Sequence, residues 1–323
     1  MSALDPELDQ FLDVVGKLLD GGVGDPEAAL DLDADDVVAR RLHESGALDL
    51  AVETADLDDA LRWLAEVVAR AARHDPSVAF ALAARFVGQR ALARAGHEES
   101  DAATSVTATL APRGDGAERE VTVAHRFSAD RVVVIGPDQV GAVVATLTGS
   151  HGNGPRRVGL AGALLGDVVV KDAEALGGDV RETLQEWSLL TAAVAIGIAE
   201  GAVALSTSYA VERQQFGTRL IEFTGLRAIL GEMALRVSQA RALMETLLLH
   251  PEAGFAEHGL VATVGRMAVD VCIDAIQVHG GYGYIDEYPV AGLLRDAISL
   301  QARCVPRREA VAALAASPSI SRG

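Results

Sequence analysis

Residues 212–217 read Glu-Arg-Gln-Gln-Phe-Gly and end a long apolar stretch with helical spacing, where the glycine is a typical helix stop. Further along, residues 277–284 read Gln-Val-His-Gly-Gly-Tyr-Gly-Tyr. Glu-Tyr-Pro follows at 287–289 and Arg-Asp-Ala at 295–297. This order predicts turns that carry glycine and polar residues at the ends of successive long helices.

Working outward, the helical pattern dominates the C-terminal part of the chain. The segments with this pattern are 178–214, 221–249, 255–279 and 291–300. Long segments joined by short connections favour a four-helix bundle, which we assign to residues 173–323.

The two preceding parts of the chain differ in the spacing of their apolar residues. In residues 104–172 the apolar side chains recur with a period of two, which predicts a small antiparallel β-barrel or sandwich. Its expected strands cover residues 106–109, 121–125, 131–135, 140–147 and 157–160. Residues 1–103 return to helical spacing and predict an N-terminal bundle of about four helices. The predicted fold class is therefore α+β, in the order helices, strands, helices.

The composition and net charge of the chain exclude several classes of protein. The chain has 323 residues, half of them hydrophobic, and a formal net charge of −18. Such a surface repels nucleic acid and anionic membranes, so we expect neither as a partner. Two cysteines give no metal-site or disulfide pattern, and no metal is expected.

We expect a cytoplasmic location. The first ten residues are acidic and lack the apolar core of a signal peptide. The longest apolar run, residues 189–205, contains Glu200 and is short for a membrane span, so it predicts a buried helix.

The quoted stretches resemble the acyl-CoA dehydrogenase family, with its Arg-x-x-Phe-Gly helix end, Gln-x-x-Gly-Gly turn and Arg-Asp-Ala helix. The resemblance is close over about a third of the chain and architectural over the rest. It implies an FAD-dependent α,β-dehydrogenation of acyl-CoA or another acyl thioester, with an electron-transfer flavoprotein as a possible acceptor.

The residue types in these stretches suit a flavin dinucleotide. An arginine at a helix end offers paired, charge-assisted bonds to a pyrophosphate, and glycines let backbone amides approach a ligand closely. In the family, such groups reach across a subunit interface to the neighbour's FAD. The resemblance implies this role for Arg213, Gln215, Phe216, Gln277, Gly280 and Gly281.

The glutamate that removes the substrate proton is missing from its commonest position. Counting nine positions from Arg295 gives Cys304, and an ordinary thiol is a poor base near neutrality. Some family members place the base on the first bundle helix, where the count from Arg213 reaches Trp187, next to Glu186. Glu186 is thus the candidate catalytic base, although it also fits a solvated glutamate at a helix start.

Two other groups fit structural roles better than catalytic ones. His279 inside the glycine turn is expected to be buried or bonded to the backbone. Asp296, beside Arg295, is expected to cap a helix start or to pair locally.

Residues 97–104 also lack the Thr-Glu-Pro-Gly-Ser-Asp-like loop that lines the flavin ring in the family. The contribution of the chain to its own cofactor site is therefore reduced, while the contribution to a neighbour is kept. This pattern resembles the shortened subunits of heteromeric steroid-degrading acyl-CoA dehydrogenases and favours a homologous dehydrogenase subunit as partner. Two alternatives stay open: a self-sufficient homo-oligomeric flavoenzyme with an atypical base, and a non-catalytic scaffold subunit.

Overall fold

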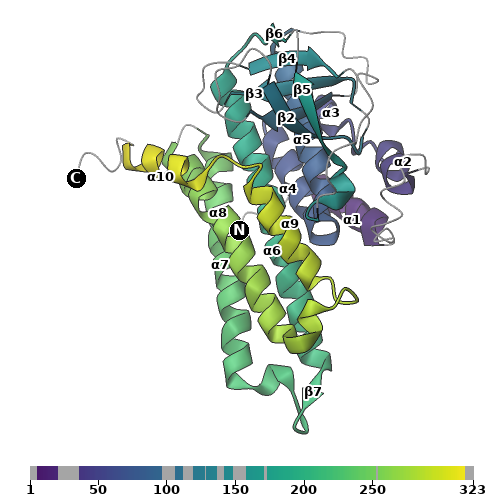
Figure 1. Ribbon diagram of the computed structural model, residues 1–323, viewed down its shortest axis with the longest axis vertical. Helices are drawn as coiled ribbons and strands as arrows, with labels where there is room; N and C mark the ends of the chain where they lie inside the picture. The colour runs from purple at the N-terminus through teal and green to yellow at the C-terminus, as the bar shows by residue number, and fades with distance from the viewer. Residues whose placement is uncertain are drawn as a thin grey trace.

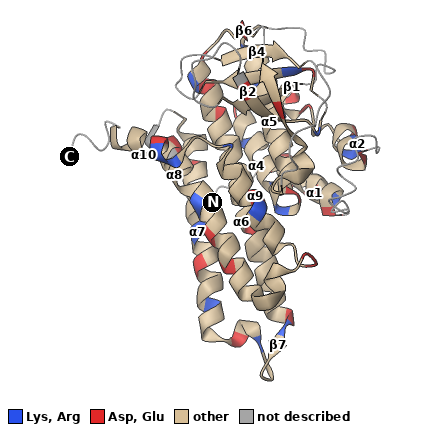
Figure 2. Cartoon of the chain, viewed as in Figure 1, with Lys and Arg blue, Asp and Glu red and all other residues tan. Residues whose placement is uncertain are grey.

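A computed structural model shows helices at one end of the molecule, small sheets against them, and a long helical bundle that extends away (Figure 1). Acidic and basic residues are scattered over the helices and do not gather in one basic face (Figure 2). The structure describes residues 6–20, 36–96, 106–111, 119–127, 129–136, 142–147, 158–170, 173–251 and 254–316. The loop 97–104 and the two boundaries expected between the zones lie outside these ranges.

The N-terminal zone is helical, as predicted. Its helices are α1 (Pro6–Asp20), α2 (Val37–Glu44), α3 (Leu50–Glu53), α4 (Ala60–His74) and α5 (Pro76–Arg94). Local sequence sets the start of α5, because the Asp75 carboxylate accepts hydrogen bonds from the amides of Ser77 and Val78 while Pro76 fills the first turn.

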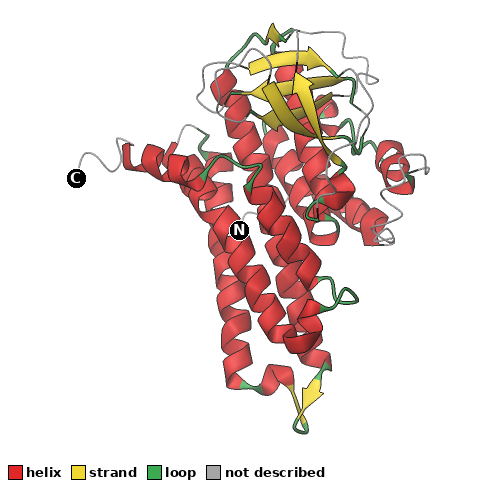
Figure 3. Ribbon diagram, in the orientation of Figure 1, coloured by secondary structure: helices red, strands yellow, loops and turns green. Residues whose placement is uncertain are grey.

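The middle zone forms two small sheets (Figure 3). Their strands are β1 (Val106–Leu110), β2 (Arg119–Ala124), β3 (Arg131–Ile135), β4 (Ala142–Thr146), β5 (Leu165–Val170) and β6 (Glu174–Ala175). One sheet has the order β1-β3-β4-β6, with β1 parallel to β3, and the other pairs β2 with β5 in antiparallel register. Val121 and Val123 of the second sheet pack against Val132 and Val134 of the first.

Within the described ranges the sheets form this two-layered packing and no closed barrel, so the sandwich alternative is confirmed. The expectation that all strands pair antiparallel is wrong for β1 and β3, which are parallel. The strand expected at 157–160 is wrong. Residues 158–160 form a bend, a short 3-10 helix η2 follows (Ala161–Ala163), and the strand is β5 instead. Leu160 is buried but Val158 is 76% exposed, so the two apolar side chains alternate as in a strand without strand pairing.

The C-terminal bundle consists of α6 (Val180–Glu212), α7 (Thr224–Leu249), α8 (Gly254–His279) and α9 (Val290–Gln301), as predicted. An additional helix, α10 (Arg307–Ala316), packs on α8. Helix α6 is long and apolar enough to cross a membrane, but 78% of its most apolar window is buried inside the protein. This confirms the prediction of a buried core helix.

Helix α6 also packs closely against α4, so the N-terminal helices and the bundle share one hydrophobic core. Glycine permits this approach at position 197. A Cβ atom there would meet the Ala69 carbonyl oxygen and lie 2.6 Å from the Ala72 Cβ. The core therefore depends on the absence of a side chain at this position.

We predict that Gly197→Ala lowers the free energy of unfolding by about 1–3 kcal/mol, because the added methyl group overpacks the contact between α4 and α6. Gly231→Ala on α7 is the matched control, since a Cβ there has no atom within 4 Å. That variant should gain about 0.5–1 kcal/mol from helix propensity. Urea denaturation measures both, and equal effects in the two variants would contradict the packing argument.

Candidate functional site

The free end of the bundle carries the predicted cofactor-binding residues. A hairpin of β7 (Gln214–Gln215) and β8 (Thr218–Arg219) follows α6, and η3 (Leu220–Glu222) leads into α7. At the same end, the 3-10 helix η4 (Gly280–Tyr284) connects α8 to α9. We call the hairpin, η4 and Arg213 the tip; it lies at the opposite end of the molecule from the β1–β6 sheets (Figure 3).

Arg213 and the diglycine turn are brought together at the tip, as the sequence predicts. The Arg213 guanidinium lies 5.0 Å from the centre of the Tyr282 ring, a cation–π contact. One turn earlier on α6, Tyr209 stacks on His279 with ring centres 4.3 Å apart. Basic residues flank the hairpin near the label β7 (Figure 2).

Sequence reasoning missed the aromatic residues that support this arrangement. Tyr288 packs edge-on against Tyr209 and at a tilt against Tyr282. The spacing of Tyr209 and Arg213 was the available signal, because residues four apart share one helix face. The aromatic group fixes the helix end from which Arg213 projects.

One residue at the tip adopts an arrangement that the chain itself does not explain. Phe216 is 95% exposed and has a left-handed backbone with φ of 54°, which is unfavourable for a bulky residue. An exposed aromatic ring on such a backbone is expected where another molecule covers the surface. Gly281 is exposed, and a Cβ there would meet no atom within 4 Å, so its backbone is open to solvent.

The remaining predicted tip residues fit the same interpretation. Gly280 has φ of 59°, which a glycine adopts without strain, and it ends α8. Gln215 and Gln277 are both exposed, so their amide groups are accessible from outside the chain. A planar cation, two amide side chains and open backbone at glycines match the phosphate and polar groups of a dinucleotide.

Glu186 is buried, so its interpretation as a solvated glutamate is wrong. The side chain is 2% exposed and lies on α6 opposite the end of α5. Its Oε1 accepts hydrogen bonds of 2.7 Å from both Arg90 and Arg94, and its Oε2 accepts one of 2.9 Å from Arg94. Both carboxylate oxygens are therefore engaged by guanidinium groups, an arrangement that suits a structural ion pair better than a proton acceptor.

Cys304 lies where the family carries its commonest base. Burial raises the pKa of its thiol to about 11, so the thiol is protonated near neutrality. It lines a cavity of about 310 Å³ between the strands and the segment that joins α9 to α10, together with Leu110, Thr122, Arg303 and Glu309. This thiol is therefore not suited to remove a substrate proton.

The expectation for His279 is confirmed. It is buried, its Nδ1 lies 2.8 Å from the Ala275 carbonyl oxygen, and burial lowers its pKa. The expectation for Asp296 is wrong, because this residue lies inside α9 and not at its start. Its Oδ1 accepts a hydrogen bond of 2.6 Å from the amide of Leu160, a residue distant in sequence.

Other classes of site have less support in the described part of the chain. No group of three or more potential metal-ligating side chains occurs there. The tip is thus the site whose chemistry and geometry point to a ligand.

These features define a class: a helix–sheet–helix protein whose bundle presents an arginine, two glutamines and a diglycine turn at its free end. Residues 178–302 match the family described as "Acyl-CoA dehydrogenase, C-terminal domain". The C-terminal domain thus matches the acyl-CoA dehydrogenase family by sequence, and over its length the chain resembles solved acyl-CoA dehydrogenases in fold.

Known proteins support the two parts of this statement separately. The chain is 30% identical over 167 residues to the caffeyl-CoA reductase–Etf complex subunit CarC of Acetobacterium woodii, covering 46% of this chain and 43% of that protein. It thus spans less than half of this relative. Butyryl-CoA dehydrogenase from Megasphaera elsdenii has a similar structure, with a TM-score of 0.78, 20% identity and coverage of 98% and 99%. The Tcur3481–Tcur3483 steroid ACAD also has a similar structure, with a TM-score of 0.78 and 20% identity; the match covers 96% of this chain and 99% of that one.

Proposed function

We propose that this chain is a subunit of an FAD-dependent acyl-CoA dehydrogenase and that its tip binds the dinucleotide part of an FAD shared with a homologous subunit. The observation that carries the proposal is the placement of Arg213, which is partly exposed, beside the diglycine turn at the end of the bundle that faces away from the β1–β6 sheets. A cofactor bound there is accessible to a second subunit.

Each tip residue has a physical role in this proposal. Arg213 binds the pyrophosphate through paired hydrogen bonds, because a guanidinium matches the geometry of phosphate oxygens. Gly280 and Gly281 leave room for the adenosine diphosphate, and Gln215 and Gln277 hydrogen-bond its polar edges. Phe216 packs its exposed ring against the cofactor or the partner surface.

The proposed reaction is the α,β-dehydrogenation of an acyl thioester. When bound, FAD accepts the hydride that leaves the β carbon. The α proton requires a base in a water-poor site, and neither candidate base in the described part of the chain suits that role. Glu186 is held by two arginines and Cys304 keeps its proton, so the partner subunit supplies the base in our proposal.

The relatives support two finer parts of the proposal. CarC is named as a subunit of a complex with Etf, which favours an electron-transfer flavoprotein as the electron acceptor. The steroid ACAD of similar fold pairs two named components, which favours a heteromeric assembly and a steroid-derived acyl group. The tip fits a self-sufficient homo-oligomer as well, because its groups would then reach the FAD of an identical neighbour. The pairing of Glu186 with two arginines and the protonated thiol of Cys304 favour a partner that supplies the base. The accessible polar groups of the tip argue against a flavin-free scaffold.

Purification tests the proposal directly. The chain is expressed alone and together with a dehydrogenase-like protein encoded beside it, and flavin per chain, subunit ratio and acyl-CoA-dependent dye reduction are measured. We expect little FAD and no turnover from the isolated chain, and FAD with turnover from a stoichiometric complex. Full activity of the isolated chain would replace the proposal with the homo-oligomer, and a flavin-free stable complex would replace it with the scaffold.

A further inference from the structure

The two positions that the sequence counts give for a catalytic base lie side by side in the structure. One is Trp187 on α6 and the other is Cys304, in the segment after α9. The Trp187 indole Nε1 donates a 3.0 Å hydrogen bond to the carbonyl oxygen of Arg303, the residue directly before Cys304. An indole and a thiol therefore occupy the two places at which a carboxylate is expected.

The Trp187 side chain is enclosed by the core. It is 1% exposed, and its ring packs edge-on against Phe80 of α5, with ring centres 6.0 Å apart. Indole has one polar group, its N–H, and a buried N–H without an acceptor is costly. The Arg303 carbonyl supplies that acceptor, so the hydrogen bond ties α6 to the segment after α9.

A second contact joins the same two elements. The Cys304 thiol is hydrogen-bonded to the hydroxyl of Thr191, and this hydroxyl donates a 2.7 Å hydrogen bond to the Trp187 carbonyl oxygen. Trp187 and Thr191 are four residues apart, so they lie on one face of α6. Residues 302–306, which we call the strap, are thus bound to α6 through both Arg303 and Cys304.

The ends of the strap are anchored on α8. Gln301 Nε2 donates a 2.8 Å hydrogen bond to the Gly265 carbonyl oxygen. Arg307 Nε donates a 3.0 Å hydrogen bond to the Ala262 carbonyl oxygen. The strap is therefore held on α8 at both ends and on α6 between them.

The strap forms one wall of the cavity beside Cys304. Arg303, Cys304 and Pro306 line the bundle side of this cavity of about 310 Å³, and residues of β1 and β2 line the other side. For an acyl chain to enter between the strap and α6, the strap would have to leave Trp187 and expose an unpaired buried N–H. The contacts with α6 therefore keep the bundle side of the cavity closed.

We propose that Trp187 is a positioning residue that clamps the strap on α6 and closes the cavity toward the bundle, so that this chain accommodates no acyl group of its own. The meaning of the clamp for catalysis rests on the proposed function, in which the partner subunit supplies the base. The clamp itself is a property of the single chain, so its test needs no flavin and no partner.

Labelling of the full chain by N-ethylmaleimide, quantified at each cysteine by mass spectrometry, tests the clamp. The chain has two cysteines: Cys272 is fully buried on α8 and reports global unfolding, whereas Cys304 reports opening of the strap. Trp187→Phe keeps an aromatic ring but lacks the N–H. Labelling of Cys304 should become about tenfold faster, the range for loss of one hydrogen bond, while Cys272 keeps its wild-type rate.

Trp63→Phe is the matched control, because Trp63 is the other tryptophan of the chain and packs against Phe11, so this variant should label like the wild type. Thr191→Val removes the hydroxyl bonded to the thiol with little change of shape, and it gives the same test where Trp187→Phe does not fold. It should also accelerate labelling of Cys304 alone.

An unchanged rate at Cys304 in the folded Trp187 variant, or equal acceleration at both cysteines, would overturn the clamp. Neither result bears on FAD binding at the tip, because Trp187 and the strap lie outside it. Conversely, a failure of FAD sharing between subunits would leave the labelling rates unaffected, so the two proposals can fail separately.

Discussion

Arg213→Ala is expected to weaken FAD binding by the assembled complex about 10- to 100-fold, the range that corresponds to losing charge-assisted hydrogen bonds to a pyrophosphate. The fold should be retained, because Arg213 is partly exposed and its contact in this chain is with the Tyr282 ring. Flavin released during dialysis, followed by absorbance and corrected for protein concentration, measures the effect.

Arg266→Ala is the matched control for this variant. Arg266 is an exposed arginine on α8 that pairs with Asp270, away from the tip. Arg213→Lys adds a second comparison, because lysine keeps the charge but not the two-pronged geometry, so an intermediate loss is expected. If the Arg213 and Arg266 variants retain FAD equally well, the tip is not the dinucleotide site.

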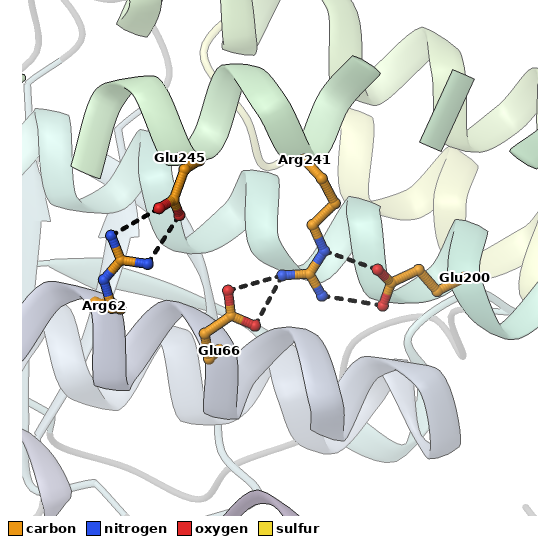
Figure 4. Close-up of polar contacts among 5 residues, drawn as sticks. All are labelled: Arg62, Glu66, Glu200, Arg241 and Glu245. Atoms are coloured by element: carbon orange, nitrogen blue, oxygen red, sulfur yellow. Dashed lines mark hydrogen bonds and ion pairs between the residues drawn. The ribbon is translucent and has the colours of Figure 1, made fainter. Parts of the chain in front are cut away.

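Arg241→Ala is expected to lower the free energy of unfolding by about 3–5 kcal/mol, the range for removal of one partner from a buried ion pair. Arg241 on α7 donates to Glu200 on α6 at 2.7 and 3.0 Å and to Glu66 on α4 at 2.9 and 2.8 Å (Figure 4). Without the guanidinium, two largely buried carboxylates face each other. Urea denaturation at neutral pH measures the loss.

The neighbouring Arg62–Glu245 pair separates the effect of charge repulsion from the effect of losing a contact. Arg62 on α4 bonds both oxygens of Glu245 on α7, so it joins the same helices through a single carboxylate and its loss should cost less (Figure 4). Adding Glu66→Gln to Arg241→Ala should restore part of the stability, because it removes one of the two facing charges. Equal losses for Arg62→Ala and Arg241→Ala would contradict the role assigned to repulsion.

The helices of the bundle were predictable because their signals are local. The expected segment 221–249 compares with α7 at Thr224–Leu249, and 255–279 compares with α8 at Gly254–His279. Apolar spacing and glycine stops act within a few residues of one another, so they can be recognised in one dimension. The bend at 158–160 was mistaken for a strand because Val158 and Leu160 alternate as strand residues do, although Leu160 is buried, Gly159 lies against α9 and Val158 is 76% exposed.

For the site, the sequence determined which residues occur at the tip and in what order, because Arg213 and the diglycine turn each follow directly from the end of a long helix. Only the tertiary structure decided the state of the carboxyl groups. Glu186 is paired with arginines from α5, and Asp296 accepts a hydrogen bond from the amide of Leu160. In both cases the partners are distant in sequence from the carboxyl group. The physical reason is that the hydrogen bonding of a carboxyl group depends on groups brought near it by folding, and local sequence does not contain them.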